Sequence, residues 1–281
     1  MSIRTALLKA AWQQAKVTLW RKYWSPAGIS TLVVPLILLA ILWFVRDAQI
    51  RDLIPVTGWI FSGTLAFGLI AGAALGVSAD IQQEREDGTL LRAKAIPRGL
   101  TGHLLAKLVV AVVDTAIPVV PLVVGAAIIL PDLLPTDPTR WLLFVMIYAL
   151  AAAAMLPWGA VLGSLFRSAL GLGIASLALY GLAAISGLFY PLTALPAALQ
   201  VIGQFTPHYW IGLGIRAVLL DDAAMALEVG GSWRIPLMLG VLAAWAVVGF
   251  LLAPKLLRRM ARKTSGSAVS EARERVLSRG Y

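Results

Sequence analysis

The chain has 281 residues, of which 59% are hydrophobic and only 14% are charged. A soluble domain carries about a quarter charged residues, so this composition excludes an ordinary soluble protein. The chain contains no cysteine, which excludes disulfides, thiol catalysis and metal sites built on cysteine. The formal net charge of +10 could indicate nucleic-acid binding, but Lys and Arg cluster beside apolar runs, as expected for a membrane protein without a nucleic-acid partner.

Several apolar runs reach about 18 residues or more, enough to cross a hydrocarbon core about 30 Å thick. A β-barrel would instead alternate apolar and polar residues in short segments, and no such pattern occurs. The predicted fold class is therefore an all-α polytopic membrane protein. We expect six transmembrane helices at about Ala27–Val45, Val56–Ala79, Leu104–Leu130, Trp141–Phe166, Ala169–Phe189 and Ile235–Ala253.

Residues 1–26 precede the first apolar run and predict an N-terminal amphipathic helix. On a helical wheel Lys9, Gln13 and Lys16 lie opposite an apolar half made of Ile3, Leu7, Leu8, Ala11, Trp12, Ala15 and Leu19. This pattern suits a helix in the inner membrane interface, with its apolar half in lipid, or an ordinary soluble amphipathic helix. We expect residues 27–263 to form the membrane domain and residues 264–281 a flexible cytoplasmic tail.

Most of the 24 Lys and Arg residues fall on one side of the membrane if both termini are cytoplasmic. The segment from Asp80 to His103 then lies on the same side. It combines acids, bases, a Gly-Thr turn and an Ile-Pro stop within an otherwise apolar chain. Thr89 suits a helix N-cap, and a short helix with Leu90, Leu91 and Ile96 on one face could dock in a groove of a partner. A solvated charged loop is the alternative interpretation.

The segment from Tyr190 to Arg234 is too apolar for a free loop, and prolines interrupt it too often for a span. Pro191, Pro196 and Pro207 divide it into short pieces. We expect an outer re-entrant helical hairpin between the fifth and sixth spans, because broken helices are tolerated where protein satisfies their backbone. Arg216 lies in this hairpin near Asp221 and Asp222, which predicts a local ion pair or, more ambitiously, a gate.

The sequence lacks the common motifs that would let this chain act as an enzyme by itself. The chain has no G-x-x-x-x-G-K-[ST] phosphate loop and no H-E-x-x-H or G-x-S-x-G motif. The two histidines, His103 and His208, fall on opposite sides of the expected topology. A metal site, a bound cofactor or a catalytic residue in this chain is therefore not expected.

Two motifs in this chain resemble a known family. The pattern E-x-E-D-G-T-L-x-x-x-x-A-x-P, from Glu84 to Pro97, resembles the cytoplasmic coupling-helix region of ATP-binding-cassette exporter permeases of the type-2 class. The stretch S-G-L-F-Y-P-L-x-x-L-P from Ser186, followed by P-H-Y-W from Pro207 and by Leu213 to Arg216, is similar to the fifth span and outer hairpin of that family. The resemblance covers nearly the whole chain.

The resemblance implies the membrane subunit of a bacterial drug, antibiotic or polysaccharide exporter in the inner membrane. Such permeases pair with an identical copy or a paralogue and bind two separate ATPase subunits, which hold ATP and Mg. The segment Glu84–Pro97, called the docking segment below, would press into the ATPase. Its contact residues would be Glu84, Arg85, Glu86, Asp87, Gly88, Thr89, Leu90, Leu91 and Pro97.

Asp114 lies about ten residues into the third expected span, about 15 Å deep at 1.5 Å per residue. A carboxylate at that depth is a functional hypothesis, either facing a substrate path or relaying a proton. The plain alternative is that a neighbouring helix caps it. Proton relay would make the chain a secondary transporter, whereas a membrane enzyme such as a lipid transferase would need a polar catalytic cluster that the sequence lacks.

Small and aromatic residues complete the candidates. Gly68, Gly72 and Gly76 repeat at four-residue spacing, as do Gly159 and Gly163, and we interpret both sets as helix-packing faces. Three aromatic residues could line a path for aromatic drugs, or simply pack in the core or face lipid: Phe67, Tyr180 and Phe189.

Overall fold

The computed structural model describes residues 3–50, 54–86, 109–166 and 168–263. The greater part of the docking segment, residues 87–97, and the predicted tail, residues 264–281, lie outside this description. The described part of the chain is mostly helical, which confirms the all-α class; its only strands form the short antiparallel hairpin β1 (Gln49–Ile50) and β2 (Ile54–Pro55).

The helices follow the order expected from the apolar runs. The first half of the chain contains α1 (Ile3–Tyr23), α2 (Pro26–Phe44), α3 (Val56–Ala71), the π-helical turn η1 (Gly72–Gly76), α4 (Val77–Glu86), a helical stretch over 109–116, and α7 (Val119–Ile129). The second half contains η2 (Pro131–Leu133), α8 (Pro138–Leu165), α9 (Ala169–Ala184), η3 (Leu192–Ala194), α10 (Ala197–Phe205), α11 (Pro207–Leu219), η4 (Asp222–Leu227) and α12 (Ile235–Lys263).

Four described helices are long and apolar enough to cross a membrane: Val56–Glu86, Val109–Ile129, Pro138–Leu165 and Ile235–Met260. The first and fifth expected spans contain shorter apolar helices, Val33–Phe44 and Leu170–Ala184. The 16 residues of α9 extend about 24 Å, somewhat less than a hydrocarbon core. Four of the six predicted spans are therefore supported by length and composition.

Two boundaries differ from the expected ones. The second span was expected to end near Ala79, but helical structure continues through α4 to Glu86, the first part of the docking segment. Gln, Glu and Arg are good helix formers and neither Gly nor Pro occurs between Val77 and Glu86, so nothing stops the helix earlier. The third span is interrupted by a turn at residues 117–118, where Pro118 lacks the backbone N–H of a regular helix.

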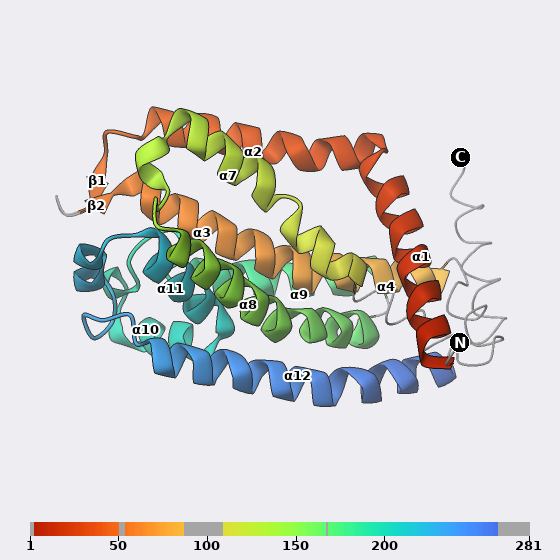
Figure 1. Cartoon of the computed structure of the whole chain (residues 1–281). Coiled ribbons are helices and arrows are strands. Elements are labelled where there is room, and N and C mark those ends of the chain that lie inside the picture. Colours follow the sequence, from red (N-terminus) through yellow and green to blue (C-terminus); the bar gives the residue numbers. More distant parts are fainter. Residues whose placement is uncertain (1–2, 51–53, 87–108, 167, 264–281) are drawn as a thin grey trace.

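The axes of the helices α2, α3, α8 and α12 are roughly parallel, and α1 crosses one end of this bundle at a steep angle (Figure 1). The elements α10, α11 and the β-hairpin gather at the opposite end. We call these the α1 end and the α11 end. In α1, Ala15 is fully buried whereas Trp12, from the same predicted apolar half, is 58% exposed.

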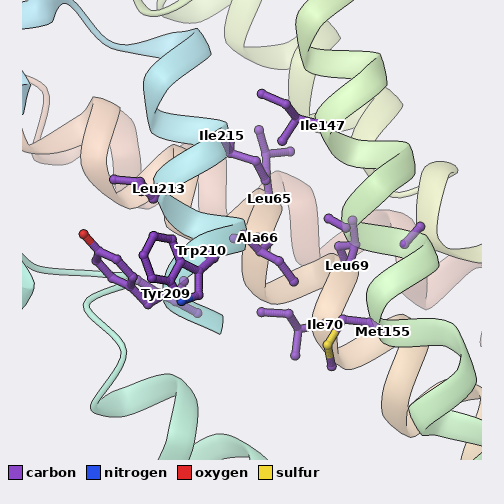
Figure 2. Packing of buried hydrophobic residues seen from close by; sticks show 14 of the residues in the cluster. Leu65, Ala66, Leu69, Ile70, Ile147, Met155, Tyr209, Trp210, Leu213 and Ile215 are labelled. Carbon is purple, nitrogen blue, oxygen red and sulfur yellow. The ribbon is translucent and has the colours of Figure 1, made fainter. Parts of the chain in front are cut away.

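The core forms where α11 packs against α3 and α8, as Figure 2 shows. From α3, Leu65, Leu69 and Ile70 are almost fully buried and meet Met155 of α8 and Ile215 of α11 in one cluster. Fully burying such a side chain contributes about 1.5–3 kcal/mol in a water-soluble protein. Inside a lipid bilayer the corresponding gain comes from close packing rather than from the release of water.

Glycines bring α8 close to the second span. A Cβ on Gly159 would overlap the carbonyl oxygen of Ala73, and one on Gly163 would lie 3.0 Å from the Cβ of Ile81. The predicted packing role of Gly159 and Gly163 is therefore confirmed. By contrast, no described atom lies within 4 Å of a Cβ built on Gly68 or Gly76, so these two do not pack within the described part of the chain.

Candidate functional sites at the two ends of the bundle

The last turns of α4 bind the connection between α8 and α9. The Gln82 side-chain amide donates to the carbonyl oxygens of Ser168 at 3.0 Å and Phe166 at 3.4 Å. The Arg85 guanidinium donates to the carbonyl oxygens of Gly163 at 3.4 Å and Phe166 at 3.3 Å. The final carbonyls of a helix have no partner within it and carry partial negative charge, so an Arg at this position both satisfies and stabilises the end of α8.

The docking segment is described only in its first three residues. Glu86 is exposed, and Glu84 and Arg85 are half-buried. Asp87, Gly88, Thr89, Leu90, Leu91 and Pro97 lie outside the described residues, so their predicted contact with an ATPase stays a prediction. The structure adds that Arg85 already binds its own chain.

Asp114 is held by the end of α1. Its carboxylate accepts hydrogen bonds from the Lys22 ammonium at 2.6 Å and the Tyr23 hydroxyl at 2.9 Å. Its side chain is 12% exposed and that of Lys22 is 40% exposed, so the pair lies at the edge of the bundle. Burial and then the nearby Asp114 carboxylate raise the pKa of Tyr23 above its ordinary value, so the phenol stays protonated and donates.

The elbow between α1 and α2 fixes this pair. The Ser25 hydroxyl caps α2 by accepting from the backbone N–H of Gly28 at 3.1 Å, and it donates to the carbonyl oxygen of Lys22 at 2.6 Å. A Cβ on Gly28 would lie 2.6 Å from the Cα of Tyr23, so only glycine permits this approach. The elbow thus orients Lys22 and Tyr23 toward Asp114.

The three candidate aromatic residues come together. The ring of Phe67 in α3 lies 5.6 Å from that of Tyr180 in α9 and 5.8 Å from that of Phe189, which follows α9. Tyr180 is 45% exposed and Phe189 is 39% exposed. The cluster therefore joins α3 to α9 and presents aromatic surface away from the core. Asp114 has its hydrogen-bond partners elsewhere, on α1.

At the α11 end a charged pair is completely buried. The Arg216 Nε lies 2.6 Å from the Glu228 Oε1, and neither side chain has any exposed surface. Arg216 also donates to the carbonyl oxygen of Gly187 at 3.2 Å and lies 4.4 Å above the Trp59 ring. The predicted local ion pair with Asp221 or Asp222 is wrong, because those carboxylates are exposed while Arg216 turns inward to Glu228.

The same network extends to α10 and to the start of α12. The Tyr209 hydroxyl donates to Glu228 Oε2 at 3.0 Å and accepts from Arg234 at 2.7 Å. Arg234 also donates to Gln204 at 2.8 Å and adopts a positive φ of 42°, uncommon for a residue other than glycine. These partners were not predicted from the sequence, although Glu228, a single acidic residue within an apolar segment, could have indicated a buried ion pair.

The three prolines of the predicted hairpin begin its short helices. Pro191 precedes η3, Pro196 precedes α10, and Pro207 is the first residue of α11. Proline suits these positions because its fixed φ is helical and its missing N–H would have no helical partner there. Among the described residues no group of His, Cys, Asp or Glu could hold a metal ion.

A model of the ABC-2 family transporter proteins matches residues 55–254 of the chain. The chain belongs to the ABC-2 transporter family. No curated protein matches the chain significantly.

This ABC-2 transporter chain is thus a membrane subunit of a transporter, as the two motifs indicated. The match begins at β2 and ends within α12, so it includes the docking segment, the aromatic cluster and the buried charges of the α11 end. The helices α1 and α2 lie before it. The contact between Lys22 and Asp114 therefore joins a helix outside the matched region to one inside it.

Proposed function

We propose that this chain is the permease subunit of an ATP-driven exporter whose ATPase is a separate polypeptide. The observation that carries the proposal is the family match over residues 55–254, which includes the docking segment. The chain has no phosphate loop of its own, so ATP and Mg would be held by the partner. Hydrolysis there would drive a permease that itself performs no chemistry.

The α1 end is the side where the ATPase would bind. Exposed basic residues gather there from both ends of the described chain, since α1 and the last turns of α12 both lie at this end (Figure 1). They include Lys9, Lys16, Arg21, Lys255, Arg258 and Arg259. The positive-inside rule then favours a cytoplasmic α1 end with both termini in the cytoplasm. We propose six spans in a bacterial inner membrane, the location that the family resemblance implies.

A second permease copy, identical or a paralogue, would complete the path. The face of α9 that carries Leu170, Ile174 and Leu177 is apolar and at least 59% exposed at each of these residues. The Phe67–Tyr180–Phe189 cluster lies beside it and offers aromatic surface to a drug-like or otherwise amphipathic substrate. We propose that the substrate passes along this side of α3 and α9.

Proton-coupled secondary transport through Asp114 has less support. The Lys22 ammonium and the Tyr23 hydroxyl both bind the Asp114 carboxylate, and this arrangement suits a structural tether between α1 and the third span better than a proton relay. Transport measurements in cells can distinguish proton-coupled from ATP-driven transport. An uncoupler that leaves ATP intact, or the substitution Asp114→Asn, should abolish proton-coupled transport, whereas an ATP-driven exporter would survive the uncoupler.

The docking segment can be tested by co-purification. The complex of the chain with its ATPase should be captured from detergent extracts, and substitutions at Glu86 and Leu91, for example Glu86→Lys and Leu91→Asp, should release the ATPase without unfolding the permease. Exposed Gln83, next to the segment, supplies the matched control Gln83→Ala. Retention of the ATPase by both docking variants would contradict the proposed contact.

A further inference from the structure

Helix α4 and the last turns of α8 form one tightly joined unit. The Ser78 hydroxyl shares its proton between two carbonyl oxygens, that of Ala74 at 2.5 Å and that of Gly159 in α8 at 2.9 Å. The glycines of α8 bring the two helices into backbone contact. One helical turn further, Gln82 and Arg85 bind the carbonyls that end α8. Displacing α4 along or across α8 would break these contacts together, so the two segments should move as one body.

The unit ends where α9 begins. Phe166 caps α8, and Ser168 caps α9 by accepting from the backbone N–H of Gly171 at 3.1 Å. Gln82 binds the carbonyl oxygens of both capping residues. The start of α9 is thereby attached to α4, although the two elements are more than 80 residues apart in the sequence.

The outward face of α9 has few partners in the described part of the chain. Leu170, Ile174 and Leu177 are 76%, 59% and 72% exposed. Buried residues on its other face are small or isolated, chiefly Ala175, Leu179 and Ala183. A helix held loosely along its length follows the attachments at its ends, and here those are the Gln82 contact and the aromatic cluster with Phe67.

We infer that Gln82 and Arg85 are positioning residues that carry displacement of the docking segment to α9 through the α8–α9 connection. The inference rests on the proposed function, because it needs an ATPase to displace the segment. It assigns Arg85 an intramolecular role and adds Gln82, which lies outside the docking motif. The aromatic surface of Tyr180 and Phe189 would then move when ATP binds.

The test uses the complex of the full chain with its ATPase in lipid nanodiscs. The natural chain has no cysteine, so spin labels can be placed without removing native thiols. One label pair joins exposed Ala79 of α4 to exposed Val34 of α2, and a second joins Leu177 of α9 to Val34. Distances are measured with and without MgATP and vanadate, with labelled permease diluted in unlabelled permease to suppress distances between copies.

In the otherwise unsubstituted chain both distances should change on trapping ATP. In the double variant Gln82→Ala/Arg85→Gln the α4 distance should still change, whereas the α9 distance should lose most of its change. ATP hydrolysis should continue while transport per ATP falls by about tenfold, a typical size for a lost coupling contact. The control Gln83→Ala should behave as the unsubstituted chain does, because the Gln83 side chain is exposed and forms no hydrogen bond with the described residues.

Persistence of the full α9 change in the double variant would overturn this inference and leave the proposed function standing. Failure of both distances to change while ATP-driven transport continues would also overturn the inference, whereas absence of ATP-driven transport by the unsubstituted complex would overturn the proposed function. If the double variant does not fold, the single variants Gln82→Ala, Arg85→Gln and Arg85→Lys can be compared instead. Lys keeps the charge at the end of α8 but loses the guanidinium geometry, so it should retain more of the α9 change than Arg85→Gln; equal changes in all single variants would contradict the assignment.

Discussion

The two ends of the bundle are held by different kinds of polar contact. At the α11 end, Arg216 and Glu228 are fully buried and bind each other at 2.6 Å. At the α1 end, Lys22 and Asp114 form an equally short pair that remains partly exposed. Buried charges tolerate little displacement, whereas exposed contacts can exchange with water. The comparison suggests a rigid α11 end and an adjustable α1 end.

The strongest way to break this comparison is to remove one buried charge. Glu228→Gln leaves the Arg216 guanidinium without a counter-charge and should destabilise the chain by about 3–5 kcal/mol. The measurement is the thermal unfolding midpoint of the purified chain in detergent. The double variant Arg216→Met/Glu228→Leu, which buries no charge, should recover much of this loss. An unchanged midpoint in Glu228→Gln would show that the pair does not hold the α11 end.

The next largest effect concerns the contact between α8 and the second span. Gly159→Ala places a methyl group on the Ala73 carbonyl and should cost about 1–3 kcal/mol. Gly76→Ala is the matched control, because its methyl group meets no described atom within 4 Å. Both variants are compared by unfolding in the same detergent. Equal losses would contradict the close approach of α8 to η1.

Substitutions in the aromatic cluster should change which substrates are exported. A contact between an aromatic substrate ring and one ring of the cluster would contribute about 0.5–1.5 kcal/mol. Phe67→Ala should therefore change the relative export of aromatic and aliphatic substrates by about two- to tenfold. Phe250, 48% exposed on α12, supplies the control Phe250→Ala. Drug-resistance profiles of cells carrying each variant provide the measurement. A uniform loss for every substrate would indicate a packing role alone.

The smallest effect is expected at the pair between α1 and the third span. Because Lys22 is 40% exposed, its interaction with Asp114 should contribute only about 0.2–1 kcal/mol after solvent screening. A double-mutant cycle with Lys22→Met and Asp114→Asn isolates that energy. A coupling energy as large as that of Arg216 with Glu228 would remove the proposed difference between the two ends.

Local patterns predicted much of this fold. Apolar runs located the helices, and the prolines located the starts of η3, α10 and α11. These features depend on residues close in sequence, where composition and proline geometry act directly. The extension of α4 to Glu86 was missed because the expected span ended with the apolar run near Ala79, although the charged residues that follow are good helix formers.

Contacts between distant residues could not be predicted in the same way. Lys22 lies 92 residues from Asp114, so the sequence showed a lone carboxylate where the structure shows a bound one. Arg216 binds Glu228 instead of the nearby Asp221 or Asp222, because the packing of α11 on Trp59 directs its side chain inward. The assembly of Phe67 with Tyr180 and Phe189 likewise depends on the packing of α9 beside α3.

Transport in proteoliposomes tests the central claim most directly. The chain is reconstituted alone, with its ATPase, and with an ATPase that binds but cannot hydrolyse ATP, and movement of a fluorescent amphipathic drug is followed after adding MgATP. The account predicts ATP hydrolysis and drug movement only when the permease and the active ATPase are both present. ATP hydrolysis by the chain alone, or equal drug movement without any ATPase, would contradict it.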